Sequence, residues 1–541
     1  MQSFIALYGF LDLVLRAYLL ATQAIIVGGV AFLTLVLSPL EGKLDAAEAP
    51  IARRCLRIIF WSCCASVLGE IVAVGVLTAM LVGTLQVDFA VAASADAVVS
   101  HFIAMILSGA LALYVRLGAG AFFMWRGGAV ALALLLVCAH VGVTHAASRP
   151  VASALLVTTE IVHLLAAAIW IGGIPFLLVA LGMTKSGEAR RLIASKFSRN
   201  AMWSVGALIA AGLLMMTRHT SDVSALYETN YGMLLSTKFV LLFGLLCFAA
   251  ANLSTTRRLW RISSTPIRRL LRFSEVEVGL GLVALFCAAA LASASLPTDG
   301  GAERTSLSEI TARFAPRWPS FHSPAYAELS AAQTPADVSS VGEPATPSPP
   351  SPADIAWAEM NHHLAGVFVV LMGFFALLER HRQTASAARN WPLLFLLLGG
   401  ILMVRADETA WPLGPIGFFE SLRDPQIVQH KVIVVLIATF AIFEWQVRRG
   451  RFKSDWPAFV FPITTGAAAA FLLTHYGHTE GKDEVLVAIS HTPIALLGVV
   501  SASARWLEIR LSDSSAGRVA GYVWPVAFIL SGLLLLLYRE V

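Results

Sequence analysis

Long apolar segments determine what this chain can fold into. A helix needs roughly 20 apolar residues to cross the hydrocarbon core of a bilayer. Fourteen segments of about this kind lie at 10–38, 57–82, 98–117, 127–147, 151–182, 201–217, 233–253, 275–296, 358–379, 391–405, 428–446, 457–474, 486–508 and 519–538. Alternating ten-residue strands, which would indicate a membrane barrel, are not seen in the sequence. We therefore predict an all-α fold, a polytopic transmembrane helical bundle of about 14 helices. The segment at 391–405 is short, and a re-entrant helix is the alternative there.

Lysine and arginine predict the orientation of these helices. The chain has 39 Lys and Arg, and most of them fall in alternate connections between the apolar segments. The richest connection joins the seventh and eighth segments and holds Arg257, Arg258, Arg261, Arg268, Arg269 and Arg272. Because cytoplasmic loops carry the excess of positive charge, we expect both the N- and C-termini to lie outside. We attribute the net charge of +5 to these cytoplasmic loops. The sequence has no basic patch interleaved with aromatic residues, so we expect no nucleic-acid partner.

One polar interruption predicts the domain organisation. Residues 297–357 are rich in Pro, Ser, Ala and Thr, a composition that does not bury a core of its own. We interpret this stretch as a periplasmic linker between an eight-helix membrane module at 1–296 and a six-helix, His-rich membrane module at 358–541. No convincing repeat relates the two modules.

The histidines are distributed asymmetrically. With the topology above, all thirteen except His322 and His381 lie at or near the outer ends of apolar segments. Ionisable side chains are costly within a membrane and mark ion pathways or binding sites there. We therefore predict that this set holds a metal ion or haem: His101, His140, His145, His163, His219, His362, His363, His430, His475, His478 and His491.

Methionines close to these histidines favour copper. Met215 and Met216 precede His219 by four and three residues, so the three side chains share a helix face. Met360 stands just before His362 and His363. Thioether sulfur together with imidazole suits Cu(I), and imidazole alone suits Cu(II) or zinc. Met215, Met216 and Met360 are therefore candidate ligands, although each methionine taken alone is better explained by packing.

Three further charged residues are predicted to orient ligands or line the ion path. Glu160 and His163 are three residues apart, so the carboxylate faces the same side of the helix as the imidazole. Glu70 lies in the middle of an apolar segment with no basic residue near it in sequence, so it needs a partner on another helix. Lys238 is a candidate partner of Glu70 or Glu160, and its alternative role is snorkelling to the outer surface.

The fifth segment, from Glu160 through His163 to Trp170-Ile-Gly172-Gly173-Ile-Pro175, carries a family resemblance. It resembles the bacterial copper resistance D (CopD) family of inner-membrane proteins, whose hallmark is an embedded His followed by an Ala-rich helix and a Trp-x-Gly-Gly turn. The resemblance is strongest over residues 150–295, where it continues through Lys238, Asn252 and the basic loop. It implies copper handling at the bacterial inner membrane, usually uptake toward the cytoplasm together with a periplasmic copper-binding protein. The family's small periplasmic copper-binding domain is not fused here, and the six-helix module is not matched.

Together these features predict a non-enzymatic membrane protein with the lipid bilayer and the copper ion as its partners. The predicted function is inner-membrane copper transport, from the periplasm toward the cytoplasm, or copper transfer through outward-facing His and Met sites. One alternative is a membrane electron-transfer protein with haem b that reduces Cu(II) or quinone. The other is an assembly partner of a copper enzyme. In the six-helix module, the histidines fit copper and haem almost equally.

Overall fold

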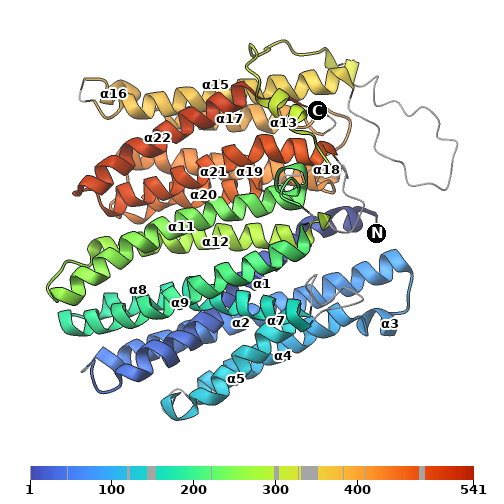
Figure 1. Ribbon diagram of the computed structural model, residues 1–541. Coiled ribbons are helices and arrows are strands. Elements are labelled where there is room, and N and C mark those ends of the chain that lie inside the picture. The colour runs from blue at the N-terminus through green and yellow to red at the C-terminus, as the bar shows by residue number, and fades with distance from the viewer. Residues whose placement is uncertain are drawn as a thin grey trace. The chain divides into compact units, whose positions relative to one another are not determined.

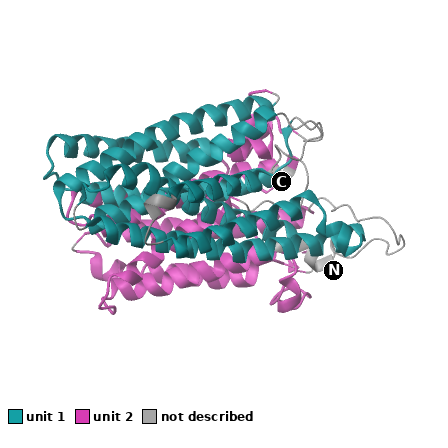
Figure 2. Cartoon of the chain, turned by 90° about the horizontal axis from the view of Figure 1, so that it is seen from below, with its two compact units in different colours: residues 1–221, 238–298 teal, residues 222–237, 299–541 magenta. Residues whose placement is uncertain are grey.

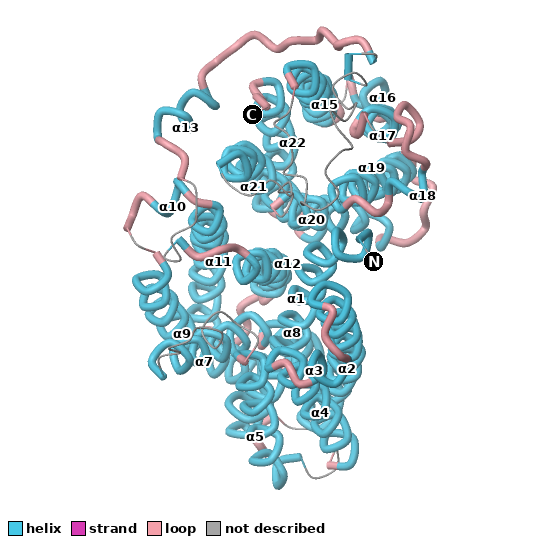
Figure 3. Tube along the Cα trace, turned by 90° about the vertical axis from the view of Figure 1, so that its right-hand side faces the viewer, coloured by secondary structure: helices cyan, strands magenta, loops and turns pink. Residues whose placement is uncertain are grey.

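The fold is helical throughout the part of the chain that can be described. A computed structural model describes residues 2–44, 47–118, 122–142, 154–220, 222–297, 304–326, 328–329, 351–381, 383–408, 410–473 and 482–540. These residues form helices joined by loops, and no strand is present among them (Figure 3). A single isolated bridge pairs Ala410 with Ile416.

The membrane-spanning helices agree with the apolar segments. Among the described residues, twelve helices are long and apolar enough to cross a membrane, and Arg126–Val141 and Trp456–Leu472 are shorter apolar helices at the two remaining positions. The candidate span Ala385–Arg405, formed by two helices with a turn between them, has 21 residues, which is enough to cross where a re-entrant segment was the alternative. The predicted all-α polytopic bundle is confirmed, and the chain is a multi-pass membrane protein. The orientation of the termini stays a prediction.

The chain divides into two compact units (Figure 2). Unit 1 comprises residues 1–221 and 238–298, and unit 2 comprises residues 222–237 and 299–541. The helices of unit 1 are α1 (Gln2–Ala31), η1 (Phe32–Leu37), η2 (Ser38–Leu40), α2 (Glu48–Leu85), α3 (Phe89–Ala93), α4 (Asp96–Leu117), α5 (Phe122–Val141), α7 (Ala154–Ala167), η4 (Ala168–Gly172), α8 (Ile174–Met183), α9 (Gly187–His219), most of α11 (Asn230–Arg261) and α12 (Arg268–Ser293).

Unit 1 is organised around its first helix. α1 packs against α2, α5, α12 and η4, and α4 packs between α2 and α5 (Figure 1). At the crossing of α1 with η4 the two backbones approach closely, because a Cβ on Gly172 would stand 1.8 Å from the carbonyl oxygen of Ala24. A Cβ on Gly28 would stand 2.3 Å from the carbonyl carbon of Gly172. Glycine at both positions allows the two backbones to come together, as small residues do between membrane helices.

Unit 2 contains the remaining helices. They are α10 (Ala225–Glu228), α13 (Leu307–Phe314), α15 (Pro352–Leu378), α16 (Ala385–Ala388), α17 (Pro392–Arg405), α18 (Phe418–Ser421), α19 (Pro425–Arg448), η6 (Trp456–Phe459), α20 (Val460–Leu472), α21 (Lys482–Arg510) and α22 (Ser515–Leu536). α22 packs against both α15 and α21, while α19 packs against α17 and α20. Helix starts follow local sequence: Ser351 caps α15 in a capping box with Asp354, and Asp424 accepts two backbone N–H groups at the start of α19.

Part of the predicted linker is structured. Ser306 begins α13 with a capping box to Glu309. The buried guanidinium of Arg313 donates to the carbonyl of Arg539, so α13 is fastened to the end of the chain. This segment belongs to unit 2 and is held there by hydrogen bonds to backbone groups. The Thr305 N–H donates to the carbonyl of Glu228, and the Arg539 side chain donates to the carbonyls of Ala312 and Ala315. Residues 330–350 lie outside the described residues.

Candidate functional site

The carboxylate of Glu70 joins two of the predicted histidines in unit 1. Glu70 lies midway along α2 and is completely buried. Its Oε2 is 2.7 Å from Nδ1 of His101 on α4, and its Oε1 is 2.6 Å from Nε2 of His140 on α5. Both imidazoles are more than nine-tenths buried. Three helices that pack together therefore bring one carboxylate and two imidazoles to a single point.

Hydrogen bonding to Glu70 determines which ring nitrogens carry lone pairs. An ionised carboxylate only accepts hydrogen bonds, so His101 Nδ1 and His140 Nε2 are the donors. In neutral rings the lone pairs then reside on His101 Nε2 and His140 Nδ1. Within the described residues, the buried His140 Nδ1 has no hydrogen-bond partner. A carboxylate that holds one imidazole nitrogen while the other stays basic is the usual arrangement around metal-binding histidines.

A small, partly polar cavity adjoins this cluster. The cavity lies beside His101 and is lined by Tyr8, Asp12 and Arg16 of α1 together with apolar residues of α1 and α2. Arg16 Nε donates to Asp12 Oδ2 over 2.6 Å across one helical turn. This charged pair gives the end of the bundle next to His101 a hydrophilic wall.

His163 occupies a separate position in unit 1. Its Nδ1 lies 3.2 Å from the carbonyl oxygen of Leu208 on α9. Gly212, one turn further along α9, leaves room for the ring, since a Cβ there would be 3.3 Å from His163 Cε1. Lys238 lies within electrostatic reach of both His163 and Glu160. The structure thus gathers His163, Glu160 and Lys238 in one neighbourhood, and their role in an ion path stays a prediction.

The Trp-x-Gly-Gly turn is a local change of helix type. Ala168–Gly172 form one π-helical stretch, and α8 continues from Ile174 with Pro175 in its first turn. π-helical turns inside α-helices often mark functional sites. Here the turn also supplies the close contact of Gly172 with α1.

The predicted Met-His group lies at the end of α9. His219 is buried there, while Met215 and Met216 are half-buried. His145 lies outside the described residues, as do His475 and His478 of the six-helix module.

In unit 2, two predicted histidines meet around the ring of Tyr538. His362 on α15 stacks on Tyr538 with ring centroids 3.7 Å apart, and the His491 ring on α21 is 5.7 Å from that of His362. Each Nδ1 donates to the carbonyl four residues earlier, over 2.8 Å to Ala358 and 2.9 Å to Val487. This hydrogen bonding places the lone pair of each neutral imidazole on Nε2.

His430 is the third histidine of this cluster. It lies in the second turn of α19, within electrostatic reach of both His362 and His491. Its Nδ1 lies 2.6 Å from Asp407 Oδ1, and Lys431 Nζ lies 3.5 Å from Asp407 Oδ2. Burial raises the pKa of the Asp407 carboxyl, but the hydrogen bond from His430 and the charges of His430 and Lys431 outweigh it, so the pKa ends below its usual value. Asp407 therefore stays ionised and orients His430.

His363 is held by backbone groups. Its Nε2 lies 3.0 Å from the carbonyl oxygen of Tyr538, and its Nδ1 lies 2.8 Å from the carbonyl oxygen and 3.1 Å from the backbone nitrogen of Ser320. Both ring nitrogens are thus engaged in fastening the chain near Ser320 and Tyr538 to α15. Met360, one turn before it, is buried.

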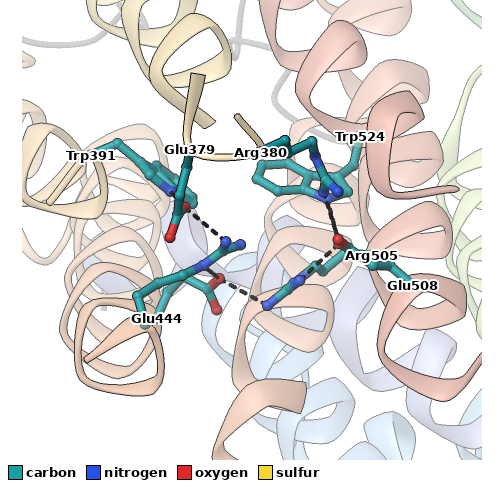
Figure 4. A network of polar contacts seen from close by, with 8 residues as sticks. Glu379, Arg380, Trp391, Glu444, Arg505, Glu508 and Trp524 are labelled. Atoms are coloured by element: carbon teal, nitrogen blue, oxygen red, sulfur yellow. Dashed lines mark hydrogen bonds and ion pairs between the residues drawn. The ribbon is translucent and has the colours of Figure 1, made fainter. Parts of the chain in front are cut away.

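Sequence reasoning missed a charged network at the other end of unit 2. Glu379, Glu444 and Glu508 alternate with three arginines between helix ends (Figure 4). Arg505 bridges Glu444 over 2.9 Å and Glu508 over 2.8 Å. The other links are Arg448 to Glu379 and Glu444, Arg380 to Glu508, Trp391 to Glu379, and Trp524 to Glu508. In the sequence these arginines contribute to the positive charge of alternate connections. The available signal for the network was the i, i+4 spacing of Glu444 with Arg448 and the i, i+3 spacing of Arg505 with Glu508.

In the described ranges, no group of three or more His, Cys, Asp or Glu is arranged to hold a metal ion. The Glu70 cluster instead offers two imidazole nitrogens on the sides of the rings away from the carboxylate.

The fold and these clusters define a multi-pass helical membrane protein with buried histidines fixed by carboxylates. The family described as Copper resistance protein D matches residues 191–291, which relates the chain to copper-resistance membrane proteins over that segment. The matched range includes Lys238 and Asn252 and begins after the Trp-x-Gly-Gly turn. No curated protein and no solved structure matches the chain.

Proposed function

We propose that this protein handles copper at the bacterial inner membrane, carrying the ion from the periplasm toward the cytoplasm or passing it on within the membrane. The observation that supports this most is the Glu70 cluster. A buried carboxylate aligns His101 and His140 and keeps one nitrogen of each ring basic. A periplasmic copper-binding protein would be the donor.

The chemistry of the donors favours copper over harder ions. Imidazole nitrogen suits Cu(I), Cu(II) and zinc, whereas Ca²⁺ and Mg²⁺ prefer several oxygens. In the Glu70 cluster the only oxygens are those of one carboxylate, and both already accept hydrogen bonds from histidine. The similarity of residues 191–291 to copper resistance protein D supports copper among these ions.

Copper accumulation by whole cells tests the proposal. Replacing His140 or His163 with alanine should lower accumulation at least about tenfold, because the loss of a ligand or of its support commonly costs 10- to 100-fold in metal affinity. His322→Ala is the matched control, since His322 is exposed. Equal accumulation by the wild type and the His140→Ala and His163→Ala variants, at equal amounts of protein in the membrane, would contradict the proposal.

A second function, electron transfer through haem b, is favoured by the pair His362 and His491. They come from two helices, and the Nδ1 of each donates to a backbone carbonyl, as is common for histidines that bind a metal through Nε2. An absorption spectrum of the purified protein separates the two functions. A Soret band supports haem, and bound copper without that band supports copper handling.

A further inference from the structure

Unit 1 contains a cavity that the copper proposal does not use. Its volume is about 370 Å³, and it lies between η4, α8, α9, α11 and α12. Pockets for small molecules typically measure about 300–1,000 Å³ and are mostly apolar with a few placed polar groups. Trp170, Phe197, Leu246 and Leu270 are among the apolar side chains that line this one.

Three polar side chains meet at one point of the cavity wall, and the hydroxyls of Ser198 and Thr256 line the cavity as well. Asn252 Nδ2 donates to Glu277 Oε2 over 2.5 Å and to Ser274 Oγ over 3.2 Å. All three side chains line the cavity and are more than nine-tenths buried. Because the amide nitrogen faces the carboxylate, the other end of the amide, Oδ1, is directed elsewhere. That oxygen is buried and has no hydrogen-bond partner among the described residues.

An unsatisfied buried acceptor costs free energy, about 1–3 kcal/mol, unless a ligand or water supplies a donor. The missing group is therefore a hydrogen-bond donor such as a hydroxyl. A copper site is disfavoured, because the polar groups of the lining are one carboxylate, one amide and three hydroxyls, with the thioether of Met202 as the one soft donor and no imidazole. A phosphate headgroup would be repelled by Glu277.

The cavity reaches the lipid-facing surface of unit 1. Met202 on α9 is 50% exposed and Ala250 on α11 is exposed, and both line the cavity. A ligand can therefore enter from the hydrocarbon and leave an apolar tail there. The aromatic side chains Trp170 and Phe197 line the cavity and can contact a ring bound there.

We propose that this cavity binds a quinol, a hydroxylated ring carried on an apolar tail. One ring hydroxyl donates to Asn252 Oδ1, the ring packs beside Trp170, and the tail leaves between α9 and α11. The site is independent of copper binding by the histidines, so either assignment can fail without the other.

Binding of decylubiquinol to the purified full-length protein in phosphatidylcholine nanodiscs, under anaerobic conditions, tests the site. The matched probe is the dimethyl ether of the same quinol, which has no hydroxyl donor at the ring. We expect saturable binding of the quinol. The ether should bind about tenfold more weakly or worse, because it leaves Asn252 Oδ1 without a hydrogen-bond donor. Equal affinities, or no saturable binding, would overturn the proposal. So would competition by phosphatidylglycerol as strong as that by the quinol.

Amino-acid substitutions test whether the quinol binds in this cavity. Asn252→Leu removes the acceptor and should weaken quinol binding at least about tenfold. Ala201→Phe adds a ring to the cavity wall and should abolish binding, whereas Ala210→Phe, on the exposed face of the same helix, should leave it unchanged. Ala201→Phe leaves the polar groups intact. If Asn252→Leu does not fold, quinol binding by Ala201→Phe and the comparison of the quinol with its dimethyl ether test the assignment. Full binding by a folded Ala201→Phe protein would overturn the assignment.

Discussion

Glu70 is the residue on which the account of unit 1 depends. A lone carboxylate within a membrane is costly to keep ionised, and it persists where partners or function require it. His101 and His140 each donate one hydrogen bond to it, so its two oxygens are occupied while each ring keeps a second nitrogen. One acidic side chain thereby sets the orientation of two imidazoles from two other helices.

Replacing Glu70 with glutamine tests this role. The amide keeps the size of the side chain but offers only one accepting oxygen, so one of the two histidines loses its acceptor. We expect copper affinity to fall about 10- to 100-fold, as measured by competition with a copper chelator. Glu188→Gln, at an exposed site of unit 1, is the control. Unchanged affinity in the Glu70→Gln protein would show that the carboxylate does not position ligands.

The sequence allowed the histidines to be predicted as a group but not their partners. Glu70 was expected to need a partner on another helix, and Lys238 was a candidate. The structure gives Glu70 two histidines from α4 and α5 and places Lys238 near Glu160. Hydropathy reveals depth in the membrane, whereas rotation of one helix against another depends on packing that the pattern of apolar residues does not specify.

At the scale of the element, η4 shows how a short motif shapes a helix. The π-helical turn and its glycines allow α1 to pack directly on the backbone. The sequence contains Gly172, Gly173 and Pro175 here, which allow close helix approach and a bend. It did not indicate which helix would approach, because many helices of this chain present small residues.

Gly172→Ala should therefore be strongly destabilising. Its Cβ would meet the backbone of Ala24, which has no flexible end to move aside, and overpacking of this kind typically costs about 1–3 kcal/mol. Gly182→Ala, in the same membrane span, meets nothing within 4 Å and should be neutral or stabilising. Thermal unfolding in detergent checks both, and equal midpoints for the two variants would contradict the packing.

α13 is held by a pH-sensitive contact. The hydrogen bond from Lys482, together with those of the Ser306 backbone and hydroxyl, lowers the pKa of Glu309 from 4.5 to about 2. A lowered pKa in the folded state means that the contribution is fully present above 4.5 and is lost as the pH falls toward 2. Because the pair is exposed, salt should weaken it.

A spin label at the exposed position 311 reports on this contact. We expect its mobility to stay constant from pH 7 to about 4, whereas Glu309→Gln should be more mobile over the whole range. A wild-type transition centred near 4.5, the ordinary value for this group, would show that the contact does not hold α13.

For the whole molecule, composition and hydropathy were sufficient to predict the class and the helices. Mean hydropathy is +0.74 and only 13% of residues are charged, which leaves a membrane bundle as the fold. The charged network of unit 2 was not predicted. Glu379, Glu444 and Glu508 pair with arginines across helix ends, and charges at such ends are equally expected for solvated loops. Replacing one residue of such a buried ion pair lowers the stability of the fold by more than the pair itself contributes, because the other charge is left buried without a partner.

The copper content of the purified protein, with X-ray absorption of the bound metal, tests the central claim most directly. We expect copper with imidazole nitrogen neighbours in the wild type, and one copper ion fewer per chain in the double variant His101→Ala, His140→Ala. His322→Ala should match the wild type. The same copper content and the same spectrum in the folded double variant would contradict the claim that the histidines held by Glu70 bind copper.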